Sequence, residues 1–337
     1  MSAIDKYQIV NRLGGGSFGE VFRVIDRALQ AEKAIKVLAV TNPALFMTSL
    51  EEAQILNRCR HKHIVAINEA NIFPVSGQPR VVLDLEFIPE GSLEDALKQR
   101  WVSIRDSVNA LRGALLGLEH AHAQGFLHRD IKPGNILLAA AAAKLSDFGL
   151  ATAPGASLVG SAQGYRTHLP AEYFSTGATT VSTDIFAAGM TLFRAVSNIS
   201  DWRAVVGAIP DAQLLLERGR LTSHIGFERY IPKTLQRIIA KACHADPAKR
   251  FQTAKAFCQK LDRLRFGTDW IRMNDYEWQG FAAGDAFTCS LVANRMECVI
   301  TKNARRQNAL CKLYTSLSEA ASAVEEHIAE TTLLGAA

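Results

Sequence analysis

The feature that most constrains this chain is the stretch His128-Arg129-Asp130-Ile131-Lys132-Pro133-Gly134-Asn135, followed after a short gap by Asp147-Phe148-Gly149. Two carboxylates, a lysine and a carboxamide at this spacing suit phosphoryl transfer from a metal-bound nucleotide. Such a site must hold Mg²⁺, orient a hydroxyl and neutralise developing charge. Either segment alone has an ordinary structural interpretation, as a surface turn or as the start of a helix. Both segments together, in this order, favour the catalytic interpretation.

The pair closely resembles the catalytic loop and the DFG motif of protein kinases, a match that requires identity at several fixed positions. The resemblance implies that Asp130 accepts the proton of the substrate hydroxyl and that Asn135 and Asp147 hold Mg²⁺. Lys132 stands where family members that act on Ser and Thr carry lysine. We therefore expect catalytic roles for Asp130, Lys132 and Asn135. ATP and Mg²⁺ are the expected phosphate donor and metal.

A glycine-rich stretch at residues 13–21 lies between two alternating apolar runs, which places it on a hairpin between strands. Before a helix, G-x-G-x-x-G would indicate a dinucleotide site; here it resembles the kinase loop that covers the ATP phosphates. Glycine lets backbone amides approach phosphates closely. The nucleotide contacts implied by this resemblance are Leu13, Gly14, Gly16, Ser17, Phe18, Gly19 and Val21.

Lys36 lies in a short apolar strand predicted over 34–38. A lysine in such a run is more often an edge or snorkelling residue, but this one stands where the kinase lysine that contacts the α- and β-phosphates is expected. Near-helical apolar spacing predicts that a helix follows over 49–60. In its pattern E-x-x-I-L, Glu52 matches the family's partner glutamate. Lys36 and Glu52 are therefore expected to act in catalysis, and Lys36 also to contact the nucleotide.

A buried-strand pattern over 81–88 resembles the run into the hinge between the two kinase lobes. The resemblance implies that Leu85 lies behind the adenine and that the backbone of Glu86 and Ile88 hydrogen-bonds it. Ser92 and Asp95 then form the capping box of a helix, with ribose contact as an alternative role.

Apolar residues at helical spacing predict a long helix over 102–125 that leads into the catalytic loop. After the loop, residues 139–143 are five alanines where the family usually has a polar turn. Alanine favours helix and supplies no turn chemistry. The sequence gives no functional reason for this departure.

The segment between Asp147 and Glu172 resembles a kinase activation segment, and an arginine at the position of Arg129 commonly clamps a phosphate there. Autophosphorylation is therefore expected. The hydroxyls available are Thr152, Ser157, Ser161, Tyr165 and Thr167. Tyr165 and His168 replace the threonine and tyrosine of the usual closing pattern, which leaves the details of substrate docking open.

Two further positions match the family. Asp184 resembles the buried aspartate that steadies the catalytic loop, and Arg250 is expected to pair with Glu172. The resemblance runs from about residue 7 to residue 264.

Composition is that of a soluble globular protein, with 48% hydrophobic and 21% charged residues. The six cysteines show no paired short spacing, nothing resembles a signal peptide, and no apolar run approaches the ~18 residues of a membrane span. We therefore expect a cytoplasmic protein with reduced thiols and no membrane anchor. The net charge of +5 is only a weak indication of nucleic-acid or membrane binding.

Residues 268–337 lie outside the resemblance. Alternation over 287–300 predicts a hairpin, and a capping box at Ser316 and Glu319 starts a helix with one apolar stripe. This region has six Lys or Arg against nine Asp or Glu, which disfavours a nucleic-acid module. We expect it to dock on the catalytic domain or on a partner, with a spacer as the alternative.

The sequence thus predicts a two-lobed α+β protein kinase with a small C-terminal α+β appendage. The catalytic domain is expected at 1–267, with an N-lobe at about 1–86 and a C-lobe at about 90–267, and the appendage at 268–337. Expected partners are protein substrates bearing Ser or Thr and a second copy for autophosphorylation. A small-molecule kinase would lack the combination of glycine loop and activation segment, and a pseudokinase would be expected to have lost Lys36, Asp130 or Asp147.

Overall fold

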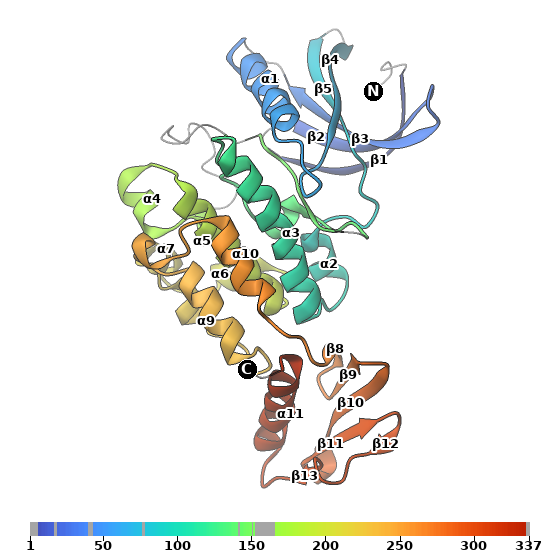
Figure 1. Ribbon diagram of the computed structural model, residues 1–337, viewed down its shortest axis with the longest axis vertical. Helices are drawn as coiled ribbons and strands as arrows, with labels where there is room; N and C mark the ends of the chain where they lie inside the picture. Colours follow the sequence, from blue (N-terminus) through green and yellow to red (C-terminus); the bar gives the residue numbers. More distant parts are fainter. Residues whose placement is uncertain are drawn as a thin grey trace.

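In this computed structural model of the protein, residues 6–16, 19–39, 43–75, 78–140, 142–149, 151 and 166–334 are described. Figure 1 shows a β-rich N-terminal part, a helical middle part, and a small sheet with one helix at the far end. The two-lobed α+β fold expected from the sequence is confirmed.

The N-lobe is a five-stranded antiparallel sheet in the order β1-β2-β3-β5-β4. Its strands are β1 (Tyr7–Gly16), β2 (Gly19–Asp26), β3 (Ala31–Ala39), β4 (Ile67–Val75) and β5 (Gln78–Leu85). The glycine stretch forms the β1–β2 hairpin, as predicted, with Gly16 paired to Gly19. Gly19 has φ +140°, and a Cβ there would lie 2.4 Å from the carbonyl oxygen of Val37. Only glycine fits this turn.

Helix α1 (Pro43–Arg58) packs on this sheet through the buried side chains of Ala53, Ile55 and Leu56. The predicted start of this helix at residue 49 was wrong, because the helix begins six residues earlier at Pro43. Proline is well suited to the first helical position, where its missing N–H has no intrahelical partner to lose. The apolar spacing that we used covered only the later turns of the helix, from residue 49 onward.

The C-lobe is built around α3 (Ile104–Ala123) and α5 (Val181–Val196). The predicted helix over 102–125 is confirmed within two residues at each end, and its cap is Ser103, whose hydroxyl accepts from the N–H of Asp106. Helix α5 is buried along almost its whole length. The other helices are α2 (Leu93–Gln99), α4 (Ala171–Thr176), α6 (Trp202–Gly207), α7 (Ala212–Glu217), α8 (Leu221–Ile225), α9 (Lys233–Ala242) and α10 (Ala254–Asp262).

The alanine run joins β6 (Ile136–Leu137) to β7 (Lys144–Leu145). Ala143 is buried, and its carbonyl oxygen lies 2.5 Å from where a Cβ on Gly113 of α3 would stand. The same oxygen accepts from Nδ1 of His63 at 3.0 Å. The close approach of the Ala143 backbone to α3 therefore accounts for glycine at position 113.

The C-terminal part holds an antiparallel sheet and helix α11 (Leu317–Thr332). The predicted hairpin is confirmed as β10 (Asp285–Val292) paired with β11 (Glu297–Lys302), and the helix cap at Ser316 is also confirmed. The sequence analysis missed β8 (Asp269–Asn274) and β9 (Glu277–Ala282), which extend this sheet. Short strands β12 (Arg305–Arg306) and β13 (Lys312–Leu313) pair with β11.

This part packs against the base of the C-lobe. The ring of Trp278 lies 5.2 Å from that of Trp101 and 5.1 Å from that of Tyr230. Arg105 of α3 donates to the carbonyl of Gly267 at 3.0 Å. Trp278 is only 3% exposed, so the interface around it is part of the buried core.

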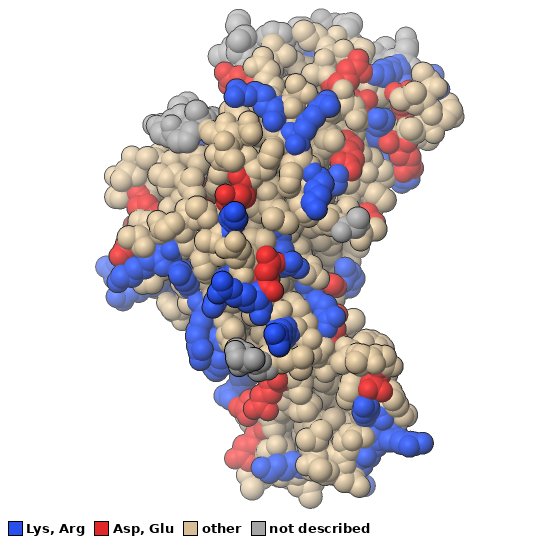
Figure 2. All heavy atoms as spheres, viewed as in Figure 1, with Lys and Arg blue, Asp and Glu red and all other residues tan. Residues whose placement is uncertain are grey.

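The surface of the C-lobe is rich in positive charge. In space-filling view, Lys and Arg gather around α9 and α10 (Figure 2).

Candidate active site

The catalytic loop is held by the buried carboxylate of Asp184, which lies near the start of α5. Asp184 accepts from the N–H groups of His128 at 2.9 Å and Arg129 at 2.8 Å, and its Oδ2 lies 2.8 Å from Nε2 of His122. Burial opposes ionisation of Asp184, but the contacts with His122 and His128 outweigh it and lower its pKa. A charged carboxylate thus fixes the loop backbone, as expected from the sequence.

Asp130 lies at the centre of this loop with two of the predicted residues in contact. Lys132 Nζ donates to Asp130 Oδ2 at 2.6 Å, and Asn135 Nδ2 donates to the same oxygen at 3.0 Å. The Asn135 side chain also donates to the Asp130 carbonyl at 2.7 Å. The backbone N–H of Asn135 donates to the Lys132 carbonyl at 3.0 Å in the short 3₁₀ turn η1 (Pro133–Asn135). Burial raises the pKa of Asp130 although Lys132 opposes the shift. A higher pKa brings a carboxylate closer to the range in which it serves as a base.

Lys36 of β3 connects the two lobes. Its Nζ donates to Glu52 Oε1 of α1 at 2.7 Å and to Asp147 Oδ1 at 2.8 Å. Burial disfavours the ammonium, but the carboxylates of Asp147 and Glu52 outweigh it and raise the pKa of Lys36. The same balance holds for Asp147: burial opposes its ionisation, but the contact with Lys36 outweighs burial and lowers the pKa of Asp147 to about 2. Burial raises the pKa of Glu52, and Lys36 opposes that shift. Lys36 and Asp147 are therefore both charged at neutral pH.

Two properties of Asp147 bear on its expected role as a ligand of a metal ion that also binds phosphates. Its side chain is 37% exposed, so one carboxylate oxygen stays accessible while Lys36 contacts the other. Its backbone has φ 61°, a left-handed conformation that costs a non-glycine residue of order 1–3 kcal/mol. Phe148, next in the chain, is fully buried against the His128 ring at 4.7 Å and holds the segment in place.

The residues present fit a Mg²⁺ ion that is bound together with a nucleotide. Asn135 uses its amide nitrogen on Asp130, which leaves its oxygen for a metal, and Asp147 offers a carboxylate oxygen. Mg²⁺ is usually held by one or two protein oxygens, with waters and substrate phosphates completing the shell. Among the described residues, no group of three or more His, Cys, Asp or Glu side chains forms a metal cage, so the phosphates would supply ligands.

The hinge begins where β5 ends at Leu85. The N–H of Glu86 donates to the carbonyl of Ala66 at 2.9 Å, and the carbonyl of Ile88 accepts from Gly91 at 3.3 Å. These bonds fix the backbone of the hinge at Glu86 and Ile88. The Ser92–Asp95 capping box predicted for α2 is present, with both reciprocal bonds formed.

The sequence analysis missed Lys144 of β7. Its Nζ donates to both carboxylate oxygens of Glu86 at 2.7 Å and so joins the hinge to the strand before Asp147. A lone lysine after an alanine run carries no signal for this contact. The analysis also missed His122 as a partner of Asp184.

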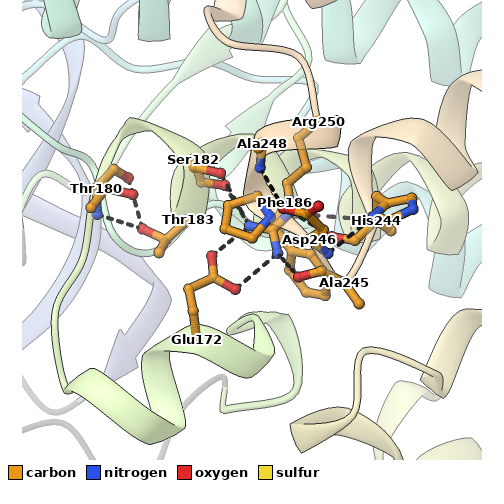
Figure 3. A network of polar contacts seen from close by, with 12 residues as sticks. Glu172, Thr180, Ser182, Thr183, Phe186, His244, Ala245, Asp246, Ala248 and Arg250 are labelled. Carbon is orange, nitrogen blue, oxygen red and sulfur yellow. Dashed lines mark hydrogen bonds and ion pairs between the residues drawn. The ribbon is translucent and has the colours of Figure 1, made fainter.

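The end of the activation segment is held by the predicted pair of Glu172 and Arg250, which Figure 3 shows as a two-pronged contact. Arg250 donates from Nη1 to Oε1 at 2.6 Å and from Nη2 to Oε2 at 2.9 Å. Its guanidinium also donates to the carbonyls of Ser182, Ala245 and His244. An arginine side chain with no exposed surface thus has several acceptors around it.

Several predicted residues lie outside the described part of the chain. They are Ser17 and Phe18 of the glycine loop and Thr152, Ser157, Ser161 and Tyr165 of the activation segment. Leu13, Gly14 and Val21 flank the hairpin on the paired strands β1 and β2. Thr167 is described, and its hydroxyl accepts from the indole N–H of Trp202 at 2.8 Å.

This fold and this set of contacting side chains define the two-lobed kinases as the class of protein. Residues 7–261 match the family described as "Protein kinase domain", and the chain belongs to that family. Serine/threonine-protein kinase PknD of Mycobacterium tuberculosis is 31% identical over 261 residues, which cover 75% of this chain and 39% of PknD. PrkC of Bacillus subtilis is 28% identical over 265 residues, 74% of this chain and 39% of PrkC.

A eukaryotic relative, serine/threonine-protein kinase STK11 of Rattus norvegicus, is 29% identical over 210 residues, 58% of this chain and 48% of STK11. The chain spans about two fifths of the length of PknD and PrkC. No helix within the described ranges combines the length and the apolar character that crossing a membrane requires.

Proposed function

We propose that this protein transfers the γ-phosphoryl group of ATP to Ser and Thr hydroxyls of protein substrates. The observation that carries the proposal is that both sets of expected contacts are formed. Lys36 contacts Glu52 and Asp147. Asp130 contacts Lys132 and Asn135. A pseudokinase that had lost one of these side chains would lack some of these contacts. The names of the curated relatives support Ser and Thr as acceptors.

Each residue has a role in this proposal. Asp130 accepts the proton as the substrate oxygen forms its bond to the γ-phosphorus and the bond to the β–γ bridging oxygen breaks. Lys132, in contact with Asp130, neutralises charge that develops on the transferring group. Lys36 holds the α- and β-phosphates, and Glu52 fixes its position. Mg²⁺, when bound to Asn135 and Asp147, would neutralise charge on the phosphates.

The nucleotide is proposed to lie between the glycine hairpin and the hinge. The hairpin contacts are Leu13, Gly14, Gly16, Ser17, Phe18, Gly19 and Val21, and the hinge contacts are Leu85, Glu86 and Ile88. The apolar side chains would cover the adenine base. The backbone amides of the hairpin would bind the phosphates.

The wider assignments belong to the same proposal. Residues 1–267 act as the catalytic domain and 268–337 as a module docked on its base, as the Trp101–Trp278 contact supports. We place the protein in the cytoplasm, with self-association during autophosphorylation and no nucleic-acid partner.

The test is incubation of the purified protein with Mg²⁺, γ-labelled ATP and peptides that each carry one Ser, Thr or Tyr. We expect labelled Ser and Thr peptides, with product sites identified by mass spectrometry. Asp130→Asn protein is the control for a contaminating kinase. Labelling of Tyr peptides alone, or no transfer above that control, would contradict the proposal.

A further inference from the structure

A strongly basic surface lies on the C-lobe around α9 and α10 (Figure 2). Residues 218–265 contain twelve Lys or Arg and three Asp or Glu, whereas the net charge of the whole chain is only +5. This stretch includes α9 and α10, where Figure 2 shows blue side chains close together. The proposed catalytic roles involve none of them, and only Arg250 is fully buried, in its pair with Glu172.

Helix α9 presents its charges as a regular row. Lys233, Arg237 and Lys241 recur every four residues and are exposed, while the opposite face of α9 is buried through Leu235, Ile238, Ile239 and Ala242. Residues four apart lie on one side of a helix, at a rise of about 6 Å. We call Lys233, Arg237 and Lys241 the basic row. Neighbouring α10 and the residue after it add the exposed cations Lys255, Lys260 and Arg263.

The surroundings of the row distinguish between classes of anionic partner. Throughout 218–265, a stretch without gaps in the structure, no large hydrophobic side chain is strongly exposed. Single-stranded nucleic acids are usually bound with aromatic side chains that stack on bases. Surfaces that lie on membranes usually insert Trp, Phe or Leu between the headgroups. A surface with charge alone suits a polar segment that carries carboxylates.

The chain itself supplies one carboxylate to this surface. Glu326 of α11 lies 3.6 Å from Arg229, just before α9, and both side chains are more than half exposed. Alternate side chains of an extended peptide lie about 6.6 Å apart on one side. That spacing is close to the rise along the basic row, so a peptide with an acidic residue at every second position can meet successive cations.

We propose that the basic row docks an acidic segment of the protein substrate, apart from the residues that are proposed to act in phosphoryl transfer. This inference rests on the proposed function, since it names the substrate class of the same enzyme. Each exposed ion pair contributes little. Docking nevertheless raises the effective concentration of a hydroxyl tethered to the segment, and so lowers KM rather than raising kcat.

The first experiment measures binding without catalysis, by fluorescence anisotropy of a labelled Glu-Gly repeat peptide on the full chain. We expect Lys233→Gln/Arg237→Gln/Lys241→Gln to weaken binding about tenfold at low salt, and salt to weaken binding to the wild type. A matched control, Lys62→Gln/Arg295→Gln/Arg305→Gln, removes the same charge from exposed positions elsewhere. We expect it to stay within about twofold of the wild type.

The second experiment uses a Ser peptide with and without the acidic repeat, joined by a Gly-Ser linker of ~30 residues that spans about 30 Å. We expect the repeat to lower KM severalfold in the wild type and the control, and to have no effect in the row variant. Turnover of the peptide without the repeat tests the proposed function separately.

Two results would overturn docking of an acidic segment. One is equal binding of the Glu-Gly peptide by the row variant and the wild type. The other is row-dependent binding of phosphatidylglycerol vesicles or an oligo-dT strand that is tighter than binding of the peptide, which would assign the surface to lipid or nucleic acid.

Discussion

Lys36 Nζ and Glu52 Oε1 lie 2.7 Å apart, and the two side chains are only 7% and 4% exposed. Such a buried pair acts as a unit, because an ammonium that contacts phosphates needs its carboxylate to hold it in place. Strand β3 and helix α1 must therefore keep a fixed distance for the site to stay assembled.

We predict that Lys36→Met and Glu52→Gln each lower kcat/KM by about 10² to 10³. The double variant should be little worse than either single one, because residues that act as a unit are not additive. Steady-state kinetics on the four proteins checks this. Exposed Glu51→Gln is the control, and losses that multiply in the double variant would contradict the pairing.

The pair of Glu172 and Arg250 is predicted to matter for stability. Glu172→Gln leaves a buried guanidinium without its carboxylate, which costs about 3 kcal/mol or more. Denaturant unfolding of this variant and of the control Glu90→Gln, at an exposed position, gives the difference in free energy of unfolding. Equal midpoints for the two variants would show that the carbonyls of Ser182, Ala245 and His244 suffice to hold Arg250.

The C-terminal part is predicted to stabilise the C-lobe through Trp278. Trp278→Ala removes a ring buried against Trp101 and Tyr230 and should cost about 3–5 kcal/mol. Phe281→Ala, at a 55% exposed position of the same strand, should cost far less. Thermal unfolding compares them. If residues 268–337 were only a spacer, a chain ending at Gly267 would keep the solubility, melting temperature and activity of the full chain.

Autophosphorylation is predicted at hydroxyls among Thr152, Ser157, Ser161 and Tyr165. Thr167 is expected to stay unmodified because its hydroxyl is held by Trp202. Mass-spectrometric mapping after long incubation with Mg²⁺ and ATP checks this, with Asp130→Asn protein as the blank. Absence of phosphate from the whole segment would remove this prediction and leave the catalytic assignment untouched.

The residues of the site could be predicted from the sequence more completely than the packing around them. Asp130, Asn135, Asp147 and Lys36 sit in motifs whose chemistry requires those residue types at fixed spacing, so their association could be predicted from a resemblance. The pairing of Glu172 with Arg250, 78 residues apart, followed in the same way.

Contacts without such motifs could not be predicted. Lys144 reaches Glu86 only because β7 passes behind the hinge, a matter of tertiary geometry. Trp278 of β9 is buried against Trp101 and Tyr230 of the C-lobe, and Trp270 of β8 packs against Phe287 of β10 and His327 of α11. Local alternation does not report burial of that kind.

The measurement that tests the central claim most directly is the single-turnover rate of γ-phosphoryl transfer by Asp130→Asn, with ATP affinity measured alongside by calorimetry. Our account predicts that transfer falls by about 10² to 10⁴ while Mg²⁺-ATP affinity stays within about threefold of the wild type. Exposed Asp106→Asn is the control. Transfer by Asp130→Asn at the wild-type rate would contradict the role of Asp130 as the base, and with it the proposed mechanism.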